Sequence, residues 1–172
     1  MTSTKYPMAL WSEVLPGLWQ GGTDDNDVVA EALWRGYQTG DEPQRPTKSQ
    51  FDSVFTFYGY ANPAGWHVKE VRVPFMDGDM SDLNAERDLW LPVHEAHSDW
   101  KAGRRVLIRC QAGLNRSGLV MALVLIREGY SPQEAVDLIR ATRGDDALFN
   151  QRFVNWLNND ANLSYWRQKV AA

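Results

Sequence analysis

The stretch VLIRCQAGLNRSG, residues 106–118, indicates the fold more clearly than any other part of the chain. Its first residues, Val106–Ile108, are apolar and mostly β-branched, and they predict a short central strand that is covered on both faces. A loop containing Gly113 follows, and Ser117 begins a segment that predicts a buried helix up to Glu128, because it is apolar nearly all round. A strand, a loop and a helix N-terminus in this order turn backbone N–H groups and the helix dipole toward one point, so the stretch predicts an anion-binding site.

Three side chains of this stretch suit phosphate chemistry. Cys110 stands at the mouth of the predicted anion site, where its sulfur can attack phosphorus, and Arg116 carries a planar fork that can hold two phosphate oxygens. Lowering the pKa of a free cysteine from about 8.5 to about 6 requires roughly 3.4 kcal/mol, of which a helix dipole supplies at most about 2 kcal/mol. The remainder would have to come from the loop N–H groups, from Arg116 and from the hydroxyl of Ser117, which can also donate to the departing thiolate.

The composition limits the possible classes of protein. The chain of 172 residues has one Cys, which excludes an internal disulfide and a Cys-rich zinc site. A formal net charge of −4 argues against a nucleic-acid-binding surface. No secretory signal is evident near the N-terminus, and the longest apolar run, residues 119–126, is too short to span a membrane. We therefore expect a single catalytic domain over residues 1–172 that is soluble, cytoplasmic and free of membrane contacts.

Other segments carry the pattern of strands. Two short strands are expected around the Pro16–Gly17 turn within residues 13–22, which close on a glycine pair. Phe51–Tyr58 is β-branched and aromatic and predicts a buried strand. Trp66–Pro74 alternates apolar and polar residues and predicts another strand. Together with the central strand, these segments predict a sheet of four or five strands.

The remaining segments carry helix signals, among them a capping box at Ser131–Glu134 with proline at the first helical position. Pro92 lies inside one helical pattern and predicts a kink there or two separate helices. Residues 36–50 predict a long exposed loop. Helices are expected over residues 28–33, 81–102, 117–128, 131–143 and from Asp145 or Asp146 to Leu157. The fold class is therefore α/β: a central mixed sheet flanked by helices, with the phosphate loop between the central strand and a buried helix.

The motif Cys110-x5-Arg116-Ser117-Gly118 resembles the signature loop of the cysteine-based protein tyrosine phosphatases, and the short chain resembles their dual-specificity branch. The resemblance covers the opening strands of that branch, its general-acid loop and its C-terminal helices. In the general-acid loop, the Val-Pro-Phe and Asp-Gly context is similar to that of the phosphatases of regenerating liver. The matching segments are residues 14–22, 73–78 and 131–143, followed by Asn150 and Phe153.

The resemblance implies a role for each matched residue. Cys110 would be the nucleophile that forms a phosphocysteine, and Asp77 would protonate the leaving oxygen and then deprotonate the attacking water. Arg116 and the loop backbone would stabilise the phosphoryl charge, so that neither a metal nor a cofactor is required. The phosphate-binding residues would be Gln111, Ala112, Gly113, Leu114, Asn115 and Arg116.

One position departs from the pattern of the family. A histidine usually precedes the nucleophile, where its hydrogen bonds hold the loop and support the thiolate, and this chain has Arg109 there. Arginine can donate similar hydrogen bonds and is always charged. We therefore expect Arg109 to support the loop and the enzyme to be active.

Two alternatives concern individual residues. Asp79 could replace Asp77 as the general acid, although we favour Asp77, and Asp82 or Ser81 is more simply a helix cap. His94 and His97 have a spacing that can bind a metal, but without a third ligand they are interpreted as an exposed or packed pair.

We expect the substrate to be a phosphorylated protein or peptide, with phosphotyrosine preferred and some phosphoserine or phosphothreonine accepted. No aromatic recognition loop of the larger tyrosine-specific enzymes is evident, which favours a shallow pocket. The alternatives are a phosphoinositide or RNA 5′-phosphatase of the same superfamily, and a pseudophosphatase that binds phosphoproteins without hydrolysing them. The negative net charge argues against RNA, and the presence of Cys110, Arg116, Ser117 and Asp77 argues against a pseudophosphatase.

Overall fold

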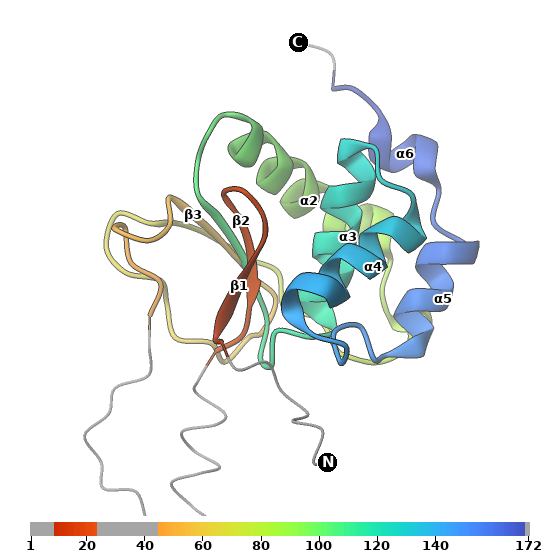
Figure 1. Cartoon of the computed structure of the whole chain (residues 1–172), viewed down its shortest axis with the longest axis horizontal. Coiled ribbons are helices and arrows are strands. Elements are labelled where there is room, and N and C mark those ends of the chain that lie inside the picture. The colour runs from red at the N-terminus through yellow and green to blue at the C-terminus, as the bar shows by residue number, and fades with distance from the viewer. Residues whose placement is uncertain (1–8, 24–44, 171–172) are drawn as a thin grey trace, which may run out of the picture.

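The computed structural model describes residues 9–23 and 45–170 (Figure 1). This part of the chain contains a five-stranded sheet in the order β1-β2-β5-β3-β4. β1 is antiparallel to β2, and all other neighbouring strands are parallel, so the sheet is mixed, as predicted. The strands are β1 (Trp11–Leu15), β2 (Leu18–Gly21), β3 (Ser53–Thr56), β4 (Lys69–Arg72) and β5 (Val106–Arg109).

The central strand β5 is buried along its whole length. Val106 and Ile108 belong to the main hydrophobic core between the sheet and the helices. Leu107 packs with Phe51 and Val54 in a smaller hydrophobic cluster. Because successive side chains of a strand point to opposite faces, β5 is covered on both sides, which confirms the prediction from its sequence.

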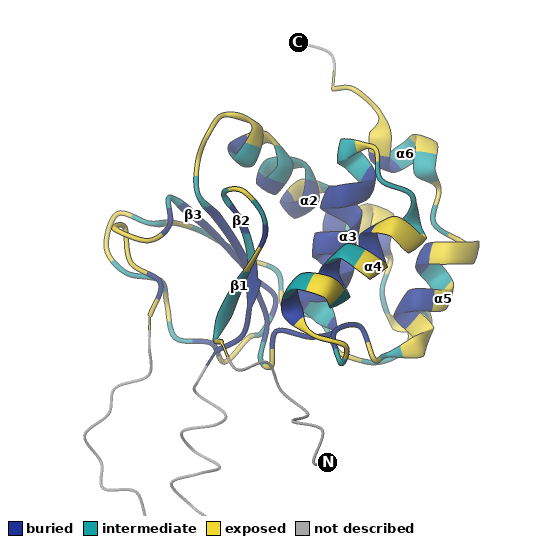
Figure 2. Cartoon of the chain, viewed as in Figure 1, coloured by how far each residue is buried: buried dark blue, intermediate teal, exposed yellow. Residues whose placement is uncertain are grey.

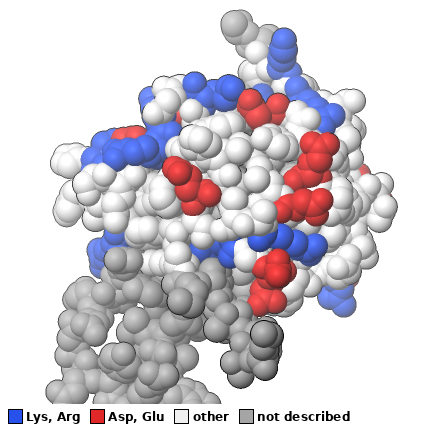
Figure 3. All heavy atoms as spheres, in the orientation of Figure 1, with Lys and Arg blue, Asp and Glu red and all other residues white. Residues whose placement is uncertain are grey.

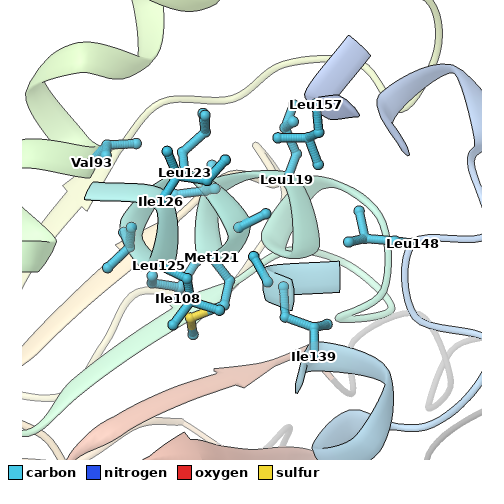
Figure 4. Close-up of a cluster of buried hydrophobic side chains, with 14 of the residues drawn as sticks. Val93, Ile108, Leu119, Met121, Leu123, Leu125, Ile126, Ile139, Leu148 and Leu157 are labelled. Carbon is cyan, nitrogen blue, oxygen red and sulfur yellow. The ribbon is translucent and has the colours of Figure 1, made fainter. Parts of the chain in front are cut away.

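The helices of the described residues gather on one side of the sheet, with α3 among the others (Figure 1). Figure 2 shows α3 as the most deeply buried helix, and every residue from Ser117 to Ile126 is buried. Figure 4 shows its side chains directed toward Val93 of α2, Ile108 of β5 and Leu157 of α5. Within residues 9–23 and 45–170 the helices are the 3-10 helix η1 (Met80–Asp82), α2 (Ala85–Lys101), α3 (Arg116–Glu128), α4 (Pro132–Arg143), α5 (Gln151–Asn159) and α6 (Leu163–Arg167).

The predicted helix ends around α3 and α4 are confirmed. Gly129 ends α3 with a φ of +121°, a conformation that glycine adopts without strain. Ser131 caps α4, because its Oγ accepts a hydrogen bond from the backbone N–H of Glu134 at 3.1 Å. The sharp turn between these two caps brings α4 against α3 on the same side of the sheet.

The prediction of a helix beginning at Asp145 or Asp146 is wrong, because α5 begins at Gln151. Leu148 has a φ of +58°, which no helix can include. The guanidinium of Arg140 donates hydrogen bonds to the carbonyl groups of Ala147 and Leu148, and these bonds hold the segment in a turn. The short helix α6 after α5 was not predicted; its Trp166 is fully buried against the core.

Two further predictions are corrected. The strand expected over Trp66–Pro74 is limited to Lys69–Arg72, because His67 has a φ of +66° and Trp66 is 90% exposed. Of the two arrangements predicted at Pro92, a kink or two separate helices, the second is wrong, since Pro92 lies inside the continuous helix α2. The helix predicted at residues 28–33 and most of the loop predicted at residues 36–50 lie outside the described residues.

Within the described ranges, no helix combines the length and the apolar character that a membrane span requires.

Shortening a side chain of α3 tests its place at the centre of the core. Leu123 is fully buried, and Leu123→Ala should lower the free energy of unfolding by about 2–5 kcal/mol, because it leaves a cavity in packed surroundings. The matched control is Leu91→Ala on α2, where the side chain is 56% exposed and the change should stay near about 0.5 kcal/mol. Urea unfolding measures both values, and equal losses would contradict the packing described.

Candidate active site

The carboxyl ends of four parallel strands meet at one edge of the sheet. Gly21, Arg109, Thr56 and Arg72 pair in one row across β2, β5, β3 and β4. The segments that follow these residues therefore leave the sheet side by side, which is where ligand sites form in parallel sheets. The segment after β5 begins with Cys110, and the segment after β4 leads to Asp77.

The loop of residues 110–115 connects β5 to the N-terminus of α3, as predicted. Gly113 has a φ of +74°, and a Cβ at this position would overlap the backbone of Gly21 and the guanidinium of Arg143. Both the conformation and the space therefore require glycine here. The loop is tied to the end of β2, because the N–H of Cys110 donates to the carbonyl of Gly21 at 3.1 Å.

Gly22, which directly follows β2, has a role that the sequence did not indicate. The N–H of Thr23 donates to the carbonyl of Gln111 at 2.8 Å, so the chain after β2 runs directly against the phosphate loop. A Cβ on Gly22 would lie 2.7 Å from the carbonyl oxygen of Gln111. Only a residue without a side chain allows this approach.

Cys110 is a buried free cysteine. Its Sγ lies 3.2 Å from the Oγ of Ser117, which is fully buried in the first turn of α3. The Oγ of Ser117 also accepts a hydrogen bond from Nε2 of Gln20 at 3.4 Å. Because the Cys110 thiol and Nε2 of Gln20 both donate to this oxygen, the hydroxyl of Ser117 is held beside the sulfur.

Arg143 supports the loop from beneath, a role that sequence reasoning missed because its position indicated only the end of α4. Its Nε donates to the carbonyl of Gly113 at 3.0 Å, and its Nη2 lies 3.4 Å from the carbonyl of Ala112. Its Nη1 donates to the carbonyl of Ala9 and to Oγ of Ser12, which fixes the start of β1. Burial lowers the pKa of Arg143 to about 10, so it stays cationic at neutral pH near Cys110.

Arg116 reaches from the start of α3 toward the acid loop. Its Nη1 donates to the carbonyl of Phe75 and its Nη2 to Oε1 of Gln111, each at 3.4 Å, and its Cζ lies 5.4 Å from the ring centroid of Tyr58. Its Nε is buried and has no hydrogen-bond partner among the described residues. Because a buried donor without a partner is costly, this atom suits a bound anion.

Asp77 is connected to the phosphate loop by two asparagine side chains. Nδ2 of Asn115, a residue of the loop, donates to Oδ2 of Asp77 at 2.9 Å, and Nδ2 of Asn150 donates to Oδ1 at 2.8 Å. Asn150 also donates from its backbone N–H to Oδ1 of Asn115 at 2.9 Å. The carboxyl group is thereby positioned beside the loop that carries Cys110. In the sequence, Asn150 matched the family only as part of a C-terminal helix. No pattern in the neighbouring residues indicated its contact with Asp77.

Asp79, the alternative candidate for the general acid, caps the 3-10 helix η1. Its Oδ1 accepts a hydrogen bond from the backbone N–H of Ser81 at 3.0 Å and caps η1. This hydrogen bond is the main cause that holds the pKa of Asp79 below its ordinary value. The carboxyl group of Asp79 therefore stabilises the end of a helix, whereas that of Asp77 lies against the phosphate loop.

Arg109 is almost fully buried, and its guanidinium is hydrogen-bonded to neighbouring strands. Its Nε donates to Oγ1 of Thr56 at 3.0 Å, and its Nη2 donates to Oε2 of Glu70 at 2.9 Å and to the carbonyl of Asn62. Oγ1 of Thr56 donates in turn to Oε2 of Glu70 at 2.6 Å. Burial disfavours the charged form of Glu70, but these hydrogen bonds outweigh it and hold the pKa of Glu70 below its ordinary value. Arg109 therefore joins β5 to β3 and β4, the strand from which the acid loop leaves.

The two histidines of α2 make separate contacts. The ring of His94 stacks on Trp90 with a centroid distance of 5.6 Å, and Nε2 of His97 lies 2.7 Å from Oε2 of Glu128. Over the described part of the chain, no group of three or more His, Cys, Asp or Glu side chains is arranged to hold a metal ion.

No family model matches the chain. Among curated proteins, cyclin-dependent kinase inhibitor 3 of Rattus norvegicus is 34% identical over 101 residues, which are 58% of this chain and 43% of that protein. The chain thus spans less than half the length of this relative. Protein 123R of Invertebrate iridescent virus 6, which is named as a tyrosine phosphatase, is 28% identical over 116 residues, 63% of this chain and 79% of that protein.

Among solved structures, the crystal structure of human DUSP28 is similar with a TM-score of 0.66 at 19% sequence identity. The similarity covers 88% of this chain and 93% of that chain. At this level of identity the comparison supports the fold: a mixed five-stranded sheet with helices, arranged as in DUSP28.

The ion pair of Arg109 and Glu70 predicts a pH-dependent contribution to stability. Glu70→Gln should lower the free energy of unfolding by about 2–3 kcal/mol at pH 7, because the buried guanidinium loses its charged partner. Since the pKa of Glu70 is lower in the folded protein, its contribution is present above about pH 4 and is lost as the pH falls further. Urea unfolding between pH 3 and 7 should therefore show the difference between wild type and variant shrinking toward acid.

The control for this variant is Glu86→Gln, an exposed carboxylate of α2, whose effect should stay within about 0.5 kcal/mol at each pH. A difference between wild type and Glu70→Gln that stays constant with pH would contradict the buried ion pair.

Proposed function

We propose that the chain hydrolyses phosphotyrosine in proteins or peptides, together with some phosphoserine or phosphothreonine. The proposal follows from the superfamily to which the chain belongs, the cysteine-based protein tyrosine phosphatases, on the branch similar to dual-specificity phosphatases. The observation that carries the proposal is the junction of two loops: Asp77 is hydrogen-bonded to Asn115, which lies in the loop that begins with Cys110. This hydrogen bond supports the proposal because it holds the proposed acid against the loop that begins with the proposed nucleophile.

The first step transfers the phosphoryl group to sulfur. The thiolate of Cys110 attacks phosphorus, the bond from phosphorus to the leaving oxygen breaks, and Asp77 gives its proton to that oxygen. The phosphoryl oxygens are held by the backbone N–H groups of residues 111–116 and by the guanidinium of Arg116, whose buried Nε has no partner among the described residues. Because these groups stabilise the negative charge, neither a metal ion nor a cofactor takes part.

The second step releases phosphate. Water attacks the phosphocysteine, its proton passes to the carboxylate of Asp77, and the bond between phosphorus and sulfur breaks. Ser117, whose Oγ lies 3.2 Å from Sγ, donates a hydrogen bond to the departing thiolate. Arg143 lies beneath the loop as a second cation and favours the negative sulfur through its charge.

The alternatives have less support. An RNA 5′-phosphatase needs a broad basic surface, and on the face drawn in Figure 3 Lys and Arg side chains are interspersed with Asp and Glu. A pseudophosphatase would not need a general acid, yet Asp77 is held against the phosphate loop by two amides. The proposed setting is the cytoplasm, because a nucleophilic thiol stays reduced there.

Replacing the nucleophile tests the reaction. The wild-type protein should hydrolyse p-nitrophenyl phosphate in the presence of a chelator, with inhibition by vanadate, and Cys110→Ser should lower kcat by more than about a thousandfold. Acid quenching of a single turnover with radiolabelled substrate should trap label on the wild-type protein alone. An unchanged melting temperature would show that Cys110→Ser is folded. If the wild type shows no vanadate-sensitive hydrolysis above the variant, the proposed function is wrong.

The choice of general acid is tested by two matched variants. Asp77→Asn should lower kcat for a phosphotyrosine peptide by about 10²–10⁴-fold, because the leaving oxygen departs without a proton. The loss should be smaller for p-nitrophenyl phosphate, whose leaving group needs less protonation. Asp79→Asn should change kcat by less than about twofold, since its carboxyl group caps η1. Equal losses in both variants would contradict the assignment of Asp77.

A further inference from the structure

The segment after β3 places an aromatic residue beside the phosphate loop. β3 and β5 are parallel, and Thr56 pairs with Arg109, so Phe57 and Tyr58 leave β3 where Cys110 leaves β5. The N–H of Phe57 donates to the carbonyl of Arg109 at 2.9 Å, which extends the pairing beyond the strand. The ring of Tyr58 is therefore fixed at the edge of the anion site.

Tyr58 contacts two of the phosphate-binding residues. The guanidinium carbon of Arg116 lies 5.4 Å from its ring centroid, and its hydroxyl accepts a hydrogen bond from Nε2 of Gln111 at 3.3 Å. Oε1 of the same Gln111 accepts a hydrogen bond from Nη2 of Arg116. The ring thus lies against the side chain that would hold the phosphoryl oxygens, at a distance that is typical of a cation–π contact.

Tyr60 extends this aromatic surface into solvent. Its ring lies 5.8 Å from that of Tyr58 at an interplanar angle of 61°, and the residue is 84% exposed. A large aromatic side chain that stands in solvent next to a binding site is a surface on which another ring can pack.

We infer that Tyr58 and Tyr60 form an aromatic wall that makes this site prefer phosphotyrosine to phosphoserine and phosphothreonine; the inference rests on the proposed phosphatase function. In phosphotyrosine a whole aromatic ring separates the phosphate from the peptide backbone, and this ring would pass along the wall when the phosphate reaches Arg116. In phosphoserine and phosphothreonine the phosphate is joined directly to the oxygen on Cβ. Their phosphate therefore brings no ring to the wall.

The test compares two synthetic peptides that are identical except for phosphotyrosine or phosphothreonine at the central position. Tyr60→Ala should lower kcat/KM for the phosphotyrosine peptide by about two- to tenfold, the range expected for one aromatic contact. The loss should appear mainly as a higher KM, because the ring of the phosphotyrosine contacts the wall equally in the bound substrate and in the transition state. The value for the phosphothreonine peptide should change less, so the preference for phosphotyrosine falls. Tyr60→Phe keeps the ring and should keep the preference.

The matched control is Trp66→Ala. Trp66 is 90% exposed and lies in the same connection between β3 and β4, but among the described residues it makes no ring contact with Tyr58 or Tyr60. This variant should leave the preference unchanged. Binding of both peptides to Cys110→Ser, with and without Tyr60→Ala, measures the same contact without turnover.

The outcomes separate the two proposals. If the wild type hydrolyses neither peptide, the proposed function is wrong, and the binding measurement still tests the wall. If the wild type is active but Tyr60→Ala leaves the preference unchanged, or Trp66→Ala reduces it equally, the inference of an aromatic wall is wrong.

Discussion

The carbonyl groups of Ala112 and Gly113 accept hydrogen bonds from two buried side chains, the guanidinium of Arg143 and the amide of Gln20. In a planar trans peptide the N–H points opposite to the carbonyl. Anchoring these carbonyls on one side of the loop therefore turns the N–H groups of the same peptides to the other side, where an anion can bind. Gly113 makes the arrangement possible, because any side chain there would overlap both β2 and Arg143. The anion site thus depends on contacts with α4 and β2 as much as on its own sequence.

Buried arginines connect this loop to the rest of the fold in two directions. Arg143 joins it to α4 and to the start of β1 through hydrogen bonds to carbonyl groups and to the hydroxyl of Ser12. Arg109 is paired with Glu70 instead, and it joins the central strand to β4. Arg109 therefore holds together the two strands that lead to Cys110 and to Asp77. Burial disfavours the charge of Glu70, but hydrogen bonds from Thr56 and Arg109 hold the pKa of Glu70 below its ordinary value, so the buried guanidinium keeps a charged partner.

Sequence patterns correctly predicted those helices, strands and caps whose formation depends on residues close to them in the chain. The strand, loop and helix around Cys110, the cap at Ser131 and the end of α3 at Gly129 all follow from torsional preferences and hydrogen bonds within a few residues. The start of α5 was predicted wrongly, because Asp145 and Asp146 resemble a helix cap. Arg140 binds the carbonyl groups of Ala147 and Leu148 and holds them in a turn, and this contact lies outside any local pattern.

The sequence by itself determined which candidate site residues share one stretch: Cys110, Arg116 and Ser117 are brought together by the covalent order of a strand, a glycine-containing turn and a helix start. Only the tertiary structure decided which residues join them from elsewhere. Asp77 is distinguished from Asp79 by amides of Asn115 and Asn150, and Tyr58 and Arg143 reach the loop from β3 and α4. The physical reason is that local periodicity and capping act over a few residues, whereas these contacts depend on the register of the strands and on side-chain packing between distant segments.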